Sequence, residues 1–216
     1  CRGASAQSSA ARRGAAQAVP MIRICVATED RLSETVAEKL LAIPNGNFHI
    51  EQRFRKNGNG YLKKRLLNFN EIARFQPVFL LTDLDDRPCA PELIYNWCAR
   101  QVLAPKLLFR VAVREIEAWL LADRDNFAEL IGVSPQKMPQ NPEALADPKR
   151  ELMNLVKRSR NRTLKREVLP DVGVKAKLGL GYNDALGRFV RDQWDPHRAA
   201  RYAPSLKKAM ARIAEL

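Results

Sequence analysis

The stretch VFLLTDLDD, residues 78–86, decides how the fold is interpreted. A short apolar run here ends in Asp83, Asp85 and Asp86. This pattern predicts a buried strand that delivers carboxylates to its C-terminal end, where open α/β sheets bind their ligands. Crowded carboxylates repel one another unless a cation lies among them, and a hard ion such as Mg²⁺ (or Mn²⁺) suits oxygen ligands. The stretch therefore indicates a metal site and phosphate chemistry.

Apolar strands and amphipathic helices alternate on both sides of this stretch. Strands are predicted at residues 22–27, 48–54, 78–81 and 106–113, and helices at 32–42, 61–74, 91–103 and from 115 onward. This order is typical of a mostly parallel sheet covered by helices. Beyond about residue 124 the strand patterns stop, and short helical stretches separated by prolines follow.

We therefore expect an α/β fold with a Rossmann-like, mostly parallel sheet at residues 21–123. A basic helical extension at 124–216 is expected to pack on it. Residues 1–20 are small, polar and aperiodic, which predicts a disordered or non-native tail before Met21. The segment GLGYNDALG, residues 179–187, lacks the spacing of a dinucleotide fingerprint and is expected to form a turn before a helix.

The positive charge is concentrated in the C-terminal third of the chain. Residues 149–216 hold 17 lysines and arginines against 7 acidic residues, which is +10 of the total net charge of +13. Such a surface is either a solvated basic helical face or a binding surface for a polyanion, most simply nucleic acid. The candidate nucleic-acid-binding residues are Lys63, Lys64, Arg65, Lys149, Lys157, Arg158, Arg160, Arg162, Lys165, Arg166 and Lys175.

Composition also limits the cellular setting and the metal chemistry. The apolar runs are far shorter than the roughly 20 residues that a membrane span needs, so no membrane association is expected. The four cysteines have no paired metal-ligand spacing, and the chain has only two histidines. A reduced, cytoplasmic protein without a zinc site fits this composition.

Acidic residues follow three of the four predicted strands. Glu29 follows the first strand, Asp83 and Asp85 the third, and Glu115 and Glu117 the fourth. The ends of parallel strands meet at one edge of a sheet, so these clusters are expected to converge. Each carboxylate also has a purely structural interpretation, because acidic residues favour the first turns of helices. Glu117 is the hardest to explain that way, since it lies among apolar neighbours and needs a partner, either Arg114 or a metal.

A glutamate after the first strand and a D-x-D after a later strand resemble the Toprim pattern of topoisomerases, bacterial primases and nucleases of the overcoming-lysogenization-defect (OLD) type. The runs VFLLTDLDD and VREIEAWLLAD are also similar to small, uncharacterised bacterial Toprim-like proteins, some linked to phage defence. The resemblance extends over residues 21–216, although the segment around Glu29 lacks the glycine that usually accompanies the Toprim glutamate.

The resemblance implies metal ligands at Glu29, Asp83, Asp85, Glu115 and Glu117. It implies a catalytic set of Glu29, Asp83, Asp85 and Glu117 with a late lysine, for which Lys149, Lys175 and Lys177 are candidates and Lys177 is the one assigned. The expected activity is Mg²⁺-dependent hydrolysis of nucleic-acid phosphodiesters, with weak sequence preference and strong salt dependence. The choice between DNA and RNA stays open.

Two other functions fit the same residues. The chain could be a non-catalytic Toprim-like subunit that binds nucleic acid or protein beside an ATPase partner in a defence system. It contains no Walker motif, so such a partner would supply any ATP hydrolysis. A phosphatase of the haloacid-dehalogenase type also uses a D-x-D after a strand, although on its first strand. Homo-oligomerisation is also left open.

Overall fold

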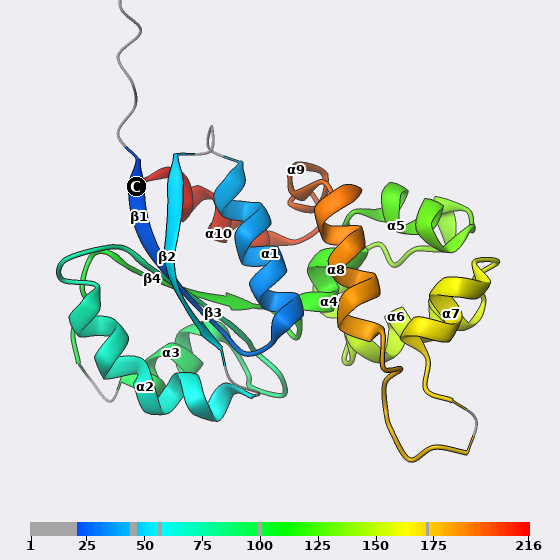
Figure 1. Cartoon of the computed structure of the whole chain (residues 1–216), viewed down its shortest axis with the longest axis horizontal. Helices are drawn as coiled ribbons and strands as arrows, with labels where there is room; N and C mark the ends of the chain where they lie inside the picture. The colour runs from blue at the N-terminus through cyan, green and yellow to red at the C-terminus, as the bar shows by residue number, and fades with distance from the viewer. Residues whose placement is uncertain (1–20, 44–46, 56–57, 99–100, 172) are drawn as a thin grey trace, which may run out of the picture.

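The computed structural model describes residues 21–43, 47–55, 58–98, 101–171 and 173–216 (Figure 1). The predicted tail at 1–20 lies outside the described residues. The first part of the chain alternates strands and helices, and the remainder is helical, as predicted. The α/β elements are β1 (Ile22–Thr28), α1 (Arg31–Ala42), β2 (Phe48–Arg55), α2 (Asn59–Ile72), β3 (Val78–Asp83), α3 (Ala90–Cys98), β4 (Leu107–Ala112) and α4 (Ile116–Ala122).

Short helices and turns make up the rest of the described chain. They are α5 (Arg124–Ile131), the 3₁₀ turns η1 (Pro135–Lys137) and η2 (Pro142–Ala144), α6 (Pro148–Lys157), α7 (Arg162–Val168), α8 (Tyr182–Asp192), α9 (Pro196–Ala199) and α10 (Pro204–Ala214). Proline occupies the first turn of several of these helices, where its missing N–H costs no hydrogen bond.

The four strands form one parallel sheet in the order β2-β1-β3-β4. The strand that carries Asp83 is therefore internal, between β1 and β4. All six residues of β3 are buried, which agrees with a strand covered on both faces. Because the strands are parallel, the segments that follow β1, β3 and β4 leave the sheet at the same edge. The predicted parallel α/β sheet is confirmed.

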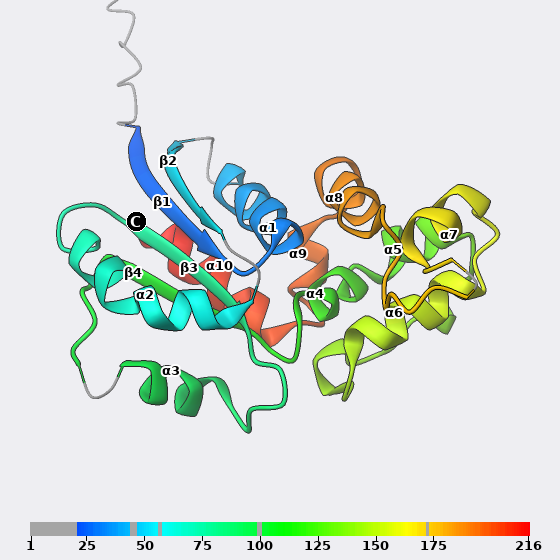
Figure 2. The ribbon, with the colours of Figure 1, turned by 60° about the horizontal axis from the view of Figure 1, so that its bottom comes forward.

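Side chains alternate between two cores on opposite faces of the sheet. Ile24, Phe79 and Leu108 point into a core shared with α1 and α10. Their sequence neighbours Cys25 and Leu80 point to the other face, where α2 and α3 cover them (Figure 2). Most of the apolar surface in the C-terminal helices joins the first of these cores.

Helix α8 ties the C-terminal region to the α/β sheet through α1 (Figure 1). The Lys39 ammonium donates a hydrogen bond to the Arg191 carbonyl over 2.8 Å. Gly187 lies beside Thr35, where an added Cβ would be in ordinary contact with the threonine hydroxyl at 3.7 Å. This packing brings the start of α8 toward the edge where β1 and β3 end.

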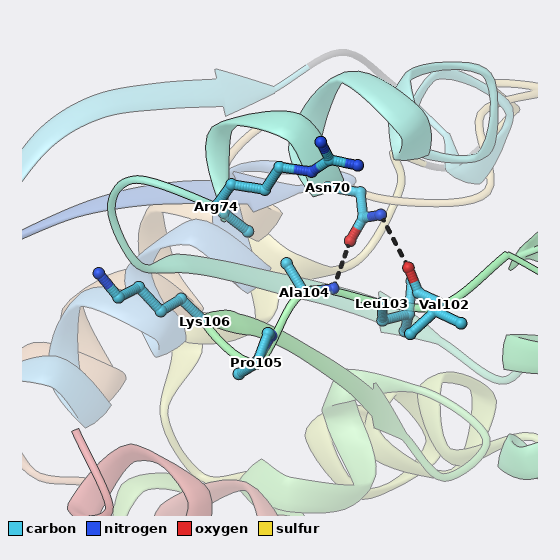
Figure 3. A pocket seen from close by; sticks show the side chains of 8 residues that line it. Asn70, Arg74, Val102, Leu103, Ala104, Pro105 and Lys106 are labelled. Atoms are coloured by element: carbon cyan, nitrogen blue, oxygen red, sulfur yellow. Dashed lines mark hydrogen bonds between the residues drawn. The ribbon is translucent and has the colours of Figure 1, made fainter.

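The predicted helix at 91–103 is wrong in its last turn. Helix α3 ends at Cys98, and residues 101–104 are not helical. The reason is Asn70 on α2, whose side-chain amide donates to the Val102 carbonyl over 3.1 Å and accepts from the Ala104 N–H over 2.7 Å (Figure 3). These bonds hold the backbone in an extended connection that leads into β4.

No helix in the described part of the chain is long and apolar enough to cross a membrane.

Candidate functional site

Glu29 and Asp83 meet at the edge where β1 and β3 end. Glu29 follows β1, and its Oε1 accepts hydrogen bonds from the Thr82 hydroxyl and, over 3.0 Å, from the Asp83 N–H. The next residue, Asp30, accepts from the Ser33 N–H over 2.8 Å and so serves as the N-cap of α1. The two carboxylates after β1 therefore have different roles, and Glu29 is the one that faces the D-x-D strand.

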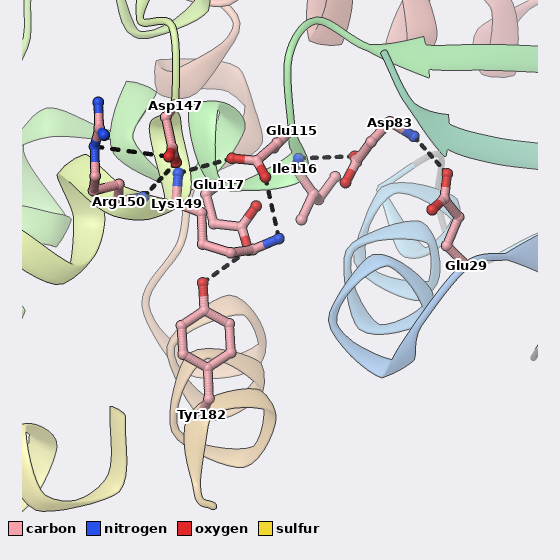
Figure 4. A network of polar contacts seen from close by, with 9 residues as sticks. All are labelled: Glu29, Asp83, Glu115, Ile116, Glu117, Asp147, Lys149, Arg150 and Tyr182. Atoms are coloured by element: carbon pink, nitrogen blue, oxygen red, sulfur yellow. Dashed lines mark hydrogen bonds and ion pairs between the residues drawn. The ribbon is translucent and has the colours of Figure 1, made fainter. Parts of the chain in front are cut away.

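Asp83 connects this edge to the start of α4. It is 9% exposed, and its Oδ1 accepts the Ile116 N–H over 2.9 Å. The next residue of α4, Glu117, is 1% exposed. The three predicted acidic clusters are thus brought together, with Glu29 just after β1, Asp83 at the end of β3 and Glu117 in the first turn of α4 (Figure 4).

Lys149 lies among the acids that follow β4. Its ammonium is 3.2 Å from Glu115 Oε1 and 3.5 Å from Glu117 Oε1. Glu115 Oε2 also accepts the backbone N–H of Lys149 over 2.9 Å, so Glu115 caps the start of α6 from outside that helix. Among the described residues, Lys149 is the only ion-pair partner of these two glutamates.

Tyr182 completes the network from the first residue of α8. Its buried hydroxyl donates to Glu117 Oε1 over 2.8 Å. The preceding glycines permit this placement, because a Cβ on Gly179 would lie 2.3 Å from the Glu167 carbonyl oxygen. The glycine-rich segment was predicted only as a turn before a helix, and the structure gives that turn a role in positioning Tyr182.

Burial and mutual repulsion raise the pKa values of the carboxyl groups. Burial raises the pKa of Glu117 to about 7, against the opposing effects of Lys149 and the Tyr182 hydrogen bond. Burial also raises the pKa of Asp83 well above its usual range, and the charges of Glu117 and Glu29 add to this effect. The pKa of Glu29 is raised by burial. The single ammonium group of Lys149 faces Glu115, Glu117 and Asp83, and its charge cannot balance all three carboxyl groups when they are ionised.

Burial alone would lower the pKa of Lys149, but the charges of Glu117, Glu115 and Asp83 raise it above its usual value. Lys149 therefore stays protonated over the physiological range. Its charge therefore neutralises part of the negative charge that the cluster carries when its carboxyl groups are ionised.

Two residues at this edge have left-handed backbone conformations. Asp85 has φ 52° and Arg114 has φ 62°, although neither is glycine. Two hydrogen bonds connect these residues. The Asp85 N–H donates to the Arg114 carbonyl over 2.8 Å, and the Arg114 guanidinium donates to the Asp85 carbonyl over 3.1 Å. Non-glycine residues in this region cost of order 1–3 kcal/mol each and gather at functional sites. The loops after β3 and β4 are thus fixed in a strained arrangement.

The other predicted site residues are less closely joined to this cluster. Asp85 is exposed, and its charge acts on Glu29 by raising the pKa of that group. The assigned lysine, Lys177, is exposed and lines a cavity beside Lys149. Of the three candidate lysines, Lys149 is the one within ion-pair distance of the acids, while Lys175 is exposed on the segment before α8.

The predicted basic surface is largely exposed. Lys157, Arg158, Arg160, Arg162 and Arg166 are exposed on α6, α7 and their connection, and Lys165 is half-buried. A second exposed group, Lys63, Lys64 and Arg65, lies on α2 a few residues after β2 ends. Lys149 differs from the rest, because it is held inside the acidic network.

The second D-x-D of the chain has a structural role. Asp123 is completely buried, accepts the Asp195 N–H over 2.7 Å and pairs with the Arg198 guanidinium at 3.1 Å. These bonds join the end of α4 to the start of α9.

The donor set suits a hard divalent cation, since it consists of carboxylate oxygens. Glu117 Oε2 is buried and has no hydrogen-bond partner among the described residues, which leaves one acceptor for such an ion. Among the described residues, however, no three His, Cys, Asp or Glu side chains are arranged so that they could hold a metal ion without moving. Asp83 Oδ1 and Glu29 Oε1 are engaged with backbone N–H groups. Metal binding therefore requires some of these side chains to turn.

Comparison with known proteins finds no matching family model, no matching curated protein and no matching solved structure.

Proposed function

We propose that the chain hydrolyses phosphodiester bonds of nucleic acid with the help of a divalent cation. The observation that carries this proposal is the orphaned Oε2 of Glu117, which is buried beside Lys149 in the same cluster as Asp83. A buried carboxylate oxygen without a partner is costly. A cation held by Glu117 and Asp83 would remove that cost and reduce the repulsion between the two carboxylates.

Asp83 and Glu117 are the residues that would hold the ion, with Glu29, Glu115 and Asp85 at its periphery. When bound, a divalent cation polarises a phosphoryl oxygen and lowers the pKa of a coordinated water. Glu29 is fixed by the Thr82 hydroxyl and the Asp83 N–H, and burial raises the pKa of its carboxyl group, which would make it a stronger base toward water. The Lys149 ammonium would neutralise developing charge on the phosphate.

The surrounding charge supports a polyanionic substrate. The exposed cations of α6 and α7 continue from the helix that carries Lys149. The residue pattern of Glu29, Asp83 and Asp85, which resembles that of Toprim proteins, points to the same class of reaction. A role in bacterial phage defence rests on that resemblance alone.

The test is a cleavage assay with labelled single-stranded and duplex DNA and RNA, with Mg²⁺, with Mn²⁺ and with EDTA. We expect cleavage by the wild type that depends on the metal, and its loss in Asp83→Asn and Glu117→Gln. Asp86→Asn is the matched control, because Asp86 is exposed in the same loop and should leave cleavage unchanged. Cleavage by Asp83→Asn at the wild-type rate would refute the proposal.

One observation favours a second candidate, a non-catalytic subunit that binds nucleic acid or protein beside an ATPase partner. Lys149 already supplies a cation to Glu115 and Glu117, so the network can also be stable as a purely structural ion cluster. This candidate predicts nucleic-acid binding that is equal with Mg²⁺ and EDTA, no cleavage under either condition, and full binding by Asp83→Asn.

A further inference from the structure

A cavity of about 610 Å³ adjoins the acidic cluster at the Lys149 side. One end is formed by Glu115 and Lys149, and the rest is lined by α6 and by residues 177–178 of the segment before α8. The volume falls within the range of about 300–1,000 Å³ typical of small-ligand pockets. The cavity therefore has room for one nucleotide unit in contact with the candidate site.

Positive charge is in excess on the wall of this cavity. Its two acids are already paired: Glu115 with Lys149, and Asp147 with Arg150, whose N–H it accepts over 2.7 Å. Lys157 and Lys177 also line the cavity, and no acidic group among the described residues lies within ion-pair distance of either. Two ammonium groups are thus available for a phosphate.

The remaining wall suits a nucleobase. Met153 and Leu178 are half-buried, pack against the core and present apolar surface to the cavity. Asn154 also lines the cavity, and its side-chain amide makes no hydrogen bond with any described residue. An apolar surface that contacts the base plane and an amide that can bond its edge are the elements by which proteins hold unstacked bases.

We propose that this cavity holds one unstacked nucleotide of a single-stranded nucleic acid, with its base against Met153 and Leu178 and its phosphates on Lys157 and Lys177. The inference deepens the proposed function, on which it rests for the placement of the neighbouring phosphate beside Lys149. A base that is stacked and paired in a duplex cannot enter, because it must leave the stack first. Single strands, or frayed ends, are therefore the preferred substrate.

The test is fluorescence anisotropy in EDTA, where nothing is cleaved, with three probes: a 12-nucleotide oligothymidine, the same backbone without bases, and a 12-base-pair duplex. We expect Asn154→Ala and Met153→Ala to weaken oligothymidine binding about 5-fold or more, within the range of single-base contacts, and to leave the abasic and duplex probes within about 2-fold. Asn96→Ala, an exposed asparagine on α3, is the matched control and should change none of them.

Lys157→Ala and Lys177→Ala should weaken all three probes and each reduce the salt slope by about 1. Equal losses for all probes in Asn154→Ala, or an unchanged affinity for oligothymidine, would overturn the nucleotide pocket. The cleavage assay separates the two proposals. Cleavage that is retained without base-dependent binding refutes only the pocket, and base-dependent binding without cleavage under any metal condition refutes only the nuclease. Circular dichroism and thermal unfolding of each variant establish that it is folded.

Discussion

Replacing Tyr182 by phenylalanine tests the electrostatics of the site without requiring any knowledge of the substrate. The change keeps the ring, which packs in the core, and removes only the hydroxyl that donates to Glu117 Oε1. A hydrogen bond to a charged group contributes about 1.5–3 kcal/mol, against about 1 kcal/mol for one between neutral groups. The cost of Tyr182→Phe should therefore depend on whether Glu117 is ionised.

The direction in which stability changes with pH follows from the pKa of Glu117. Burial raises the pKa of this group from an ordinary value of 4.5 to about 7, so between these pH values the folded state binds more protons than the unfolded state. The stability that Glu117 contributes is therefore fully present below about pH 4.5 and is lost as the pH rises to about 7. Removing the hydroxyl raises the pKa of Glu117 further, because the Tyr182 hydrogen bond lowers it.

We expect Tyr182→Phe to lower the free energy of unfolding by about 1 kcal/mol at pH 5 and by about 2–3 kcal/mol at pH 8. The measurement is urea unfolding at equilibrium in EDTA, with the midpoint and slope compared at each pH. Tyr202→Phe is the matched control, since Tyr202 is 41% exposed and its change should stay within about 0.5 kcal/mol. A cost for Tyr182→Phe that is the same at both pH values would refute the ionised Glu117–Tyr182 bond.

Three further predictions concern the cation and the backbone. Saturating Mg²⁺, at about 100 times its dissociation constant, should stabilise the wild type by about 2.7 kcal/mol in thermal unfolding and leave the stability of Asp83→Asn unchanged. Equal stabilisation of both proteins would mean that the ion binds elsewhere. Gly179→Ala should destabilise by about 3 kcal/mol or more because its Cβ would meet two backbone carbonyls, whereas Gly60→Ala, where the space is open, should be neutral or slightly stabilising. Asn70→Ala should cost about 2–4 kcal/mol through its two lost backbone bonds, and the exposed Asn68→Ala on the same helix almost nothing, as chemical denaturation of the pair can measure.

The sequence was most informative about features that depend on a local pattern of apolar residues and on the repeated alternation of strands and helices. The apolar run before Asp83 and the alternation around it are sufficient to predict a buried parallel strand, because a strand covered on both faces must be apolar throughout. The convergence of Glu29, Asp83 and Glu117 followed from topology alone, since parallel strands end at one edge. These inferences need no knowledge of which side chains touch.

What the sequence could not indicate are contacts between distant segments. Tyr182 lies 65 residues from Glu117, and nothing in its neighbourhood marks a tyrosine that will meet a carboxylate. The glycines before Tyr182 indicate a turn, but they do not indicate which residue the tyrosine hydroxyl will contact. For the same reason, the sequence could not indicate which of the late lysines lies within ion-pair distance of the acids. Asp147 and Pro148 do indicate a helix that begins just before Lys149, yet only the docking of α6 on α4 brings that helix start to Glu115.

The end of α3 shows a third kind of limit. Residues 91–103 carry a helical pattern, and local preference favours continuing the helix. The Asn70 side chain overrides that preference by satisfying the backbone of the connection that enters β4. A single side chain from another helix therefore fixes the backbone at Val102 and Ala104, which no local pattern encodes.

The order in which the network lies along the chain has a consequence for biosynthesis. Its four carboxylates all precede its cation, and Lys149 follows Glu115 by 34 residues. A nascent chain emerges from the ribosome N-terminus first. The sheet therefore leaves the ribosome with its acidic edge uncompensated, and Tyr182 arrives later still. Until α6 and α8 have been synthesised and have docked, Glu117 therefore lacks its contacts with Lys149 and Tyr182.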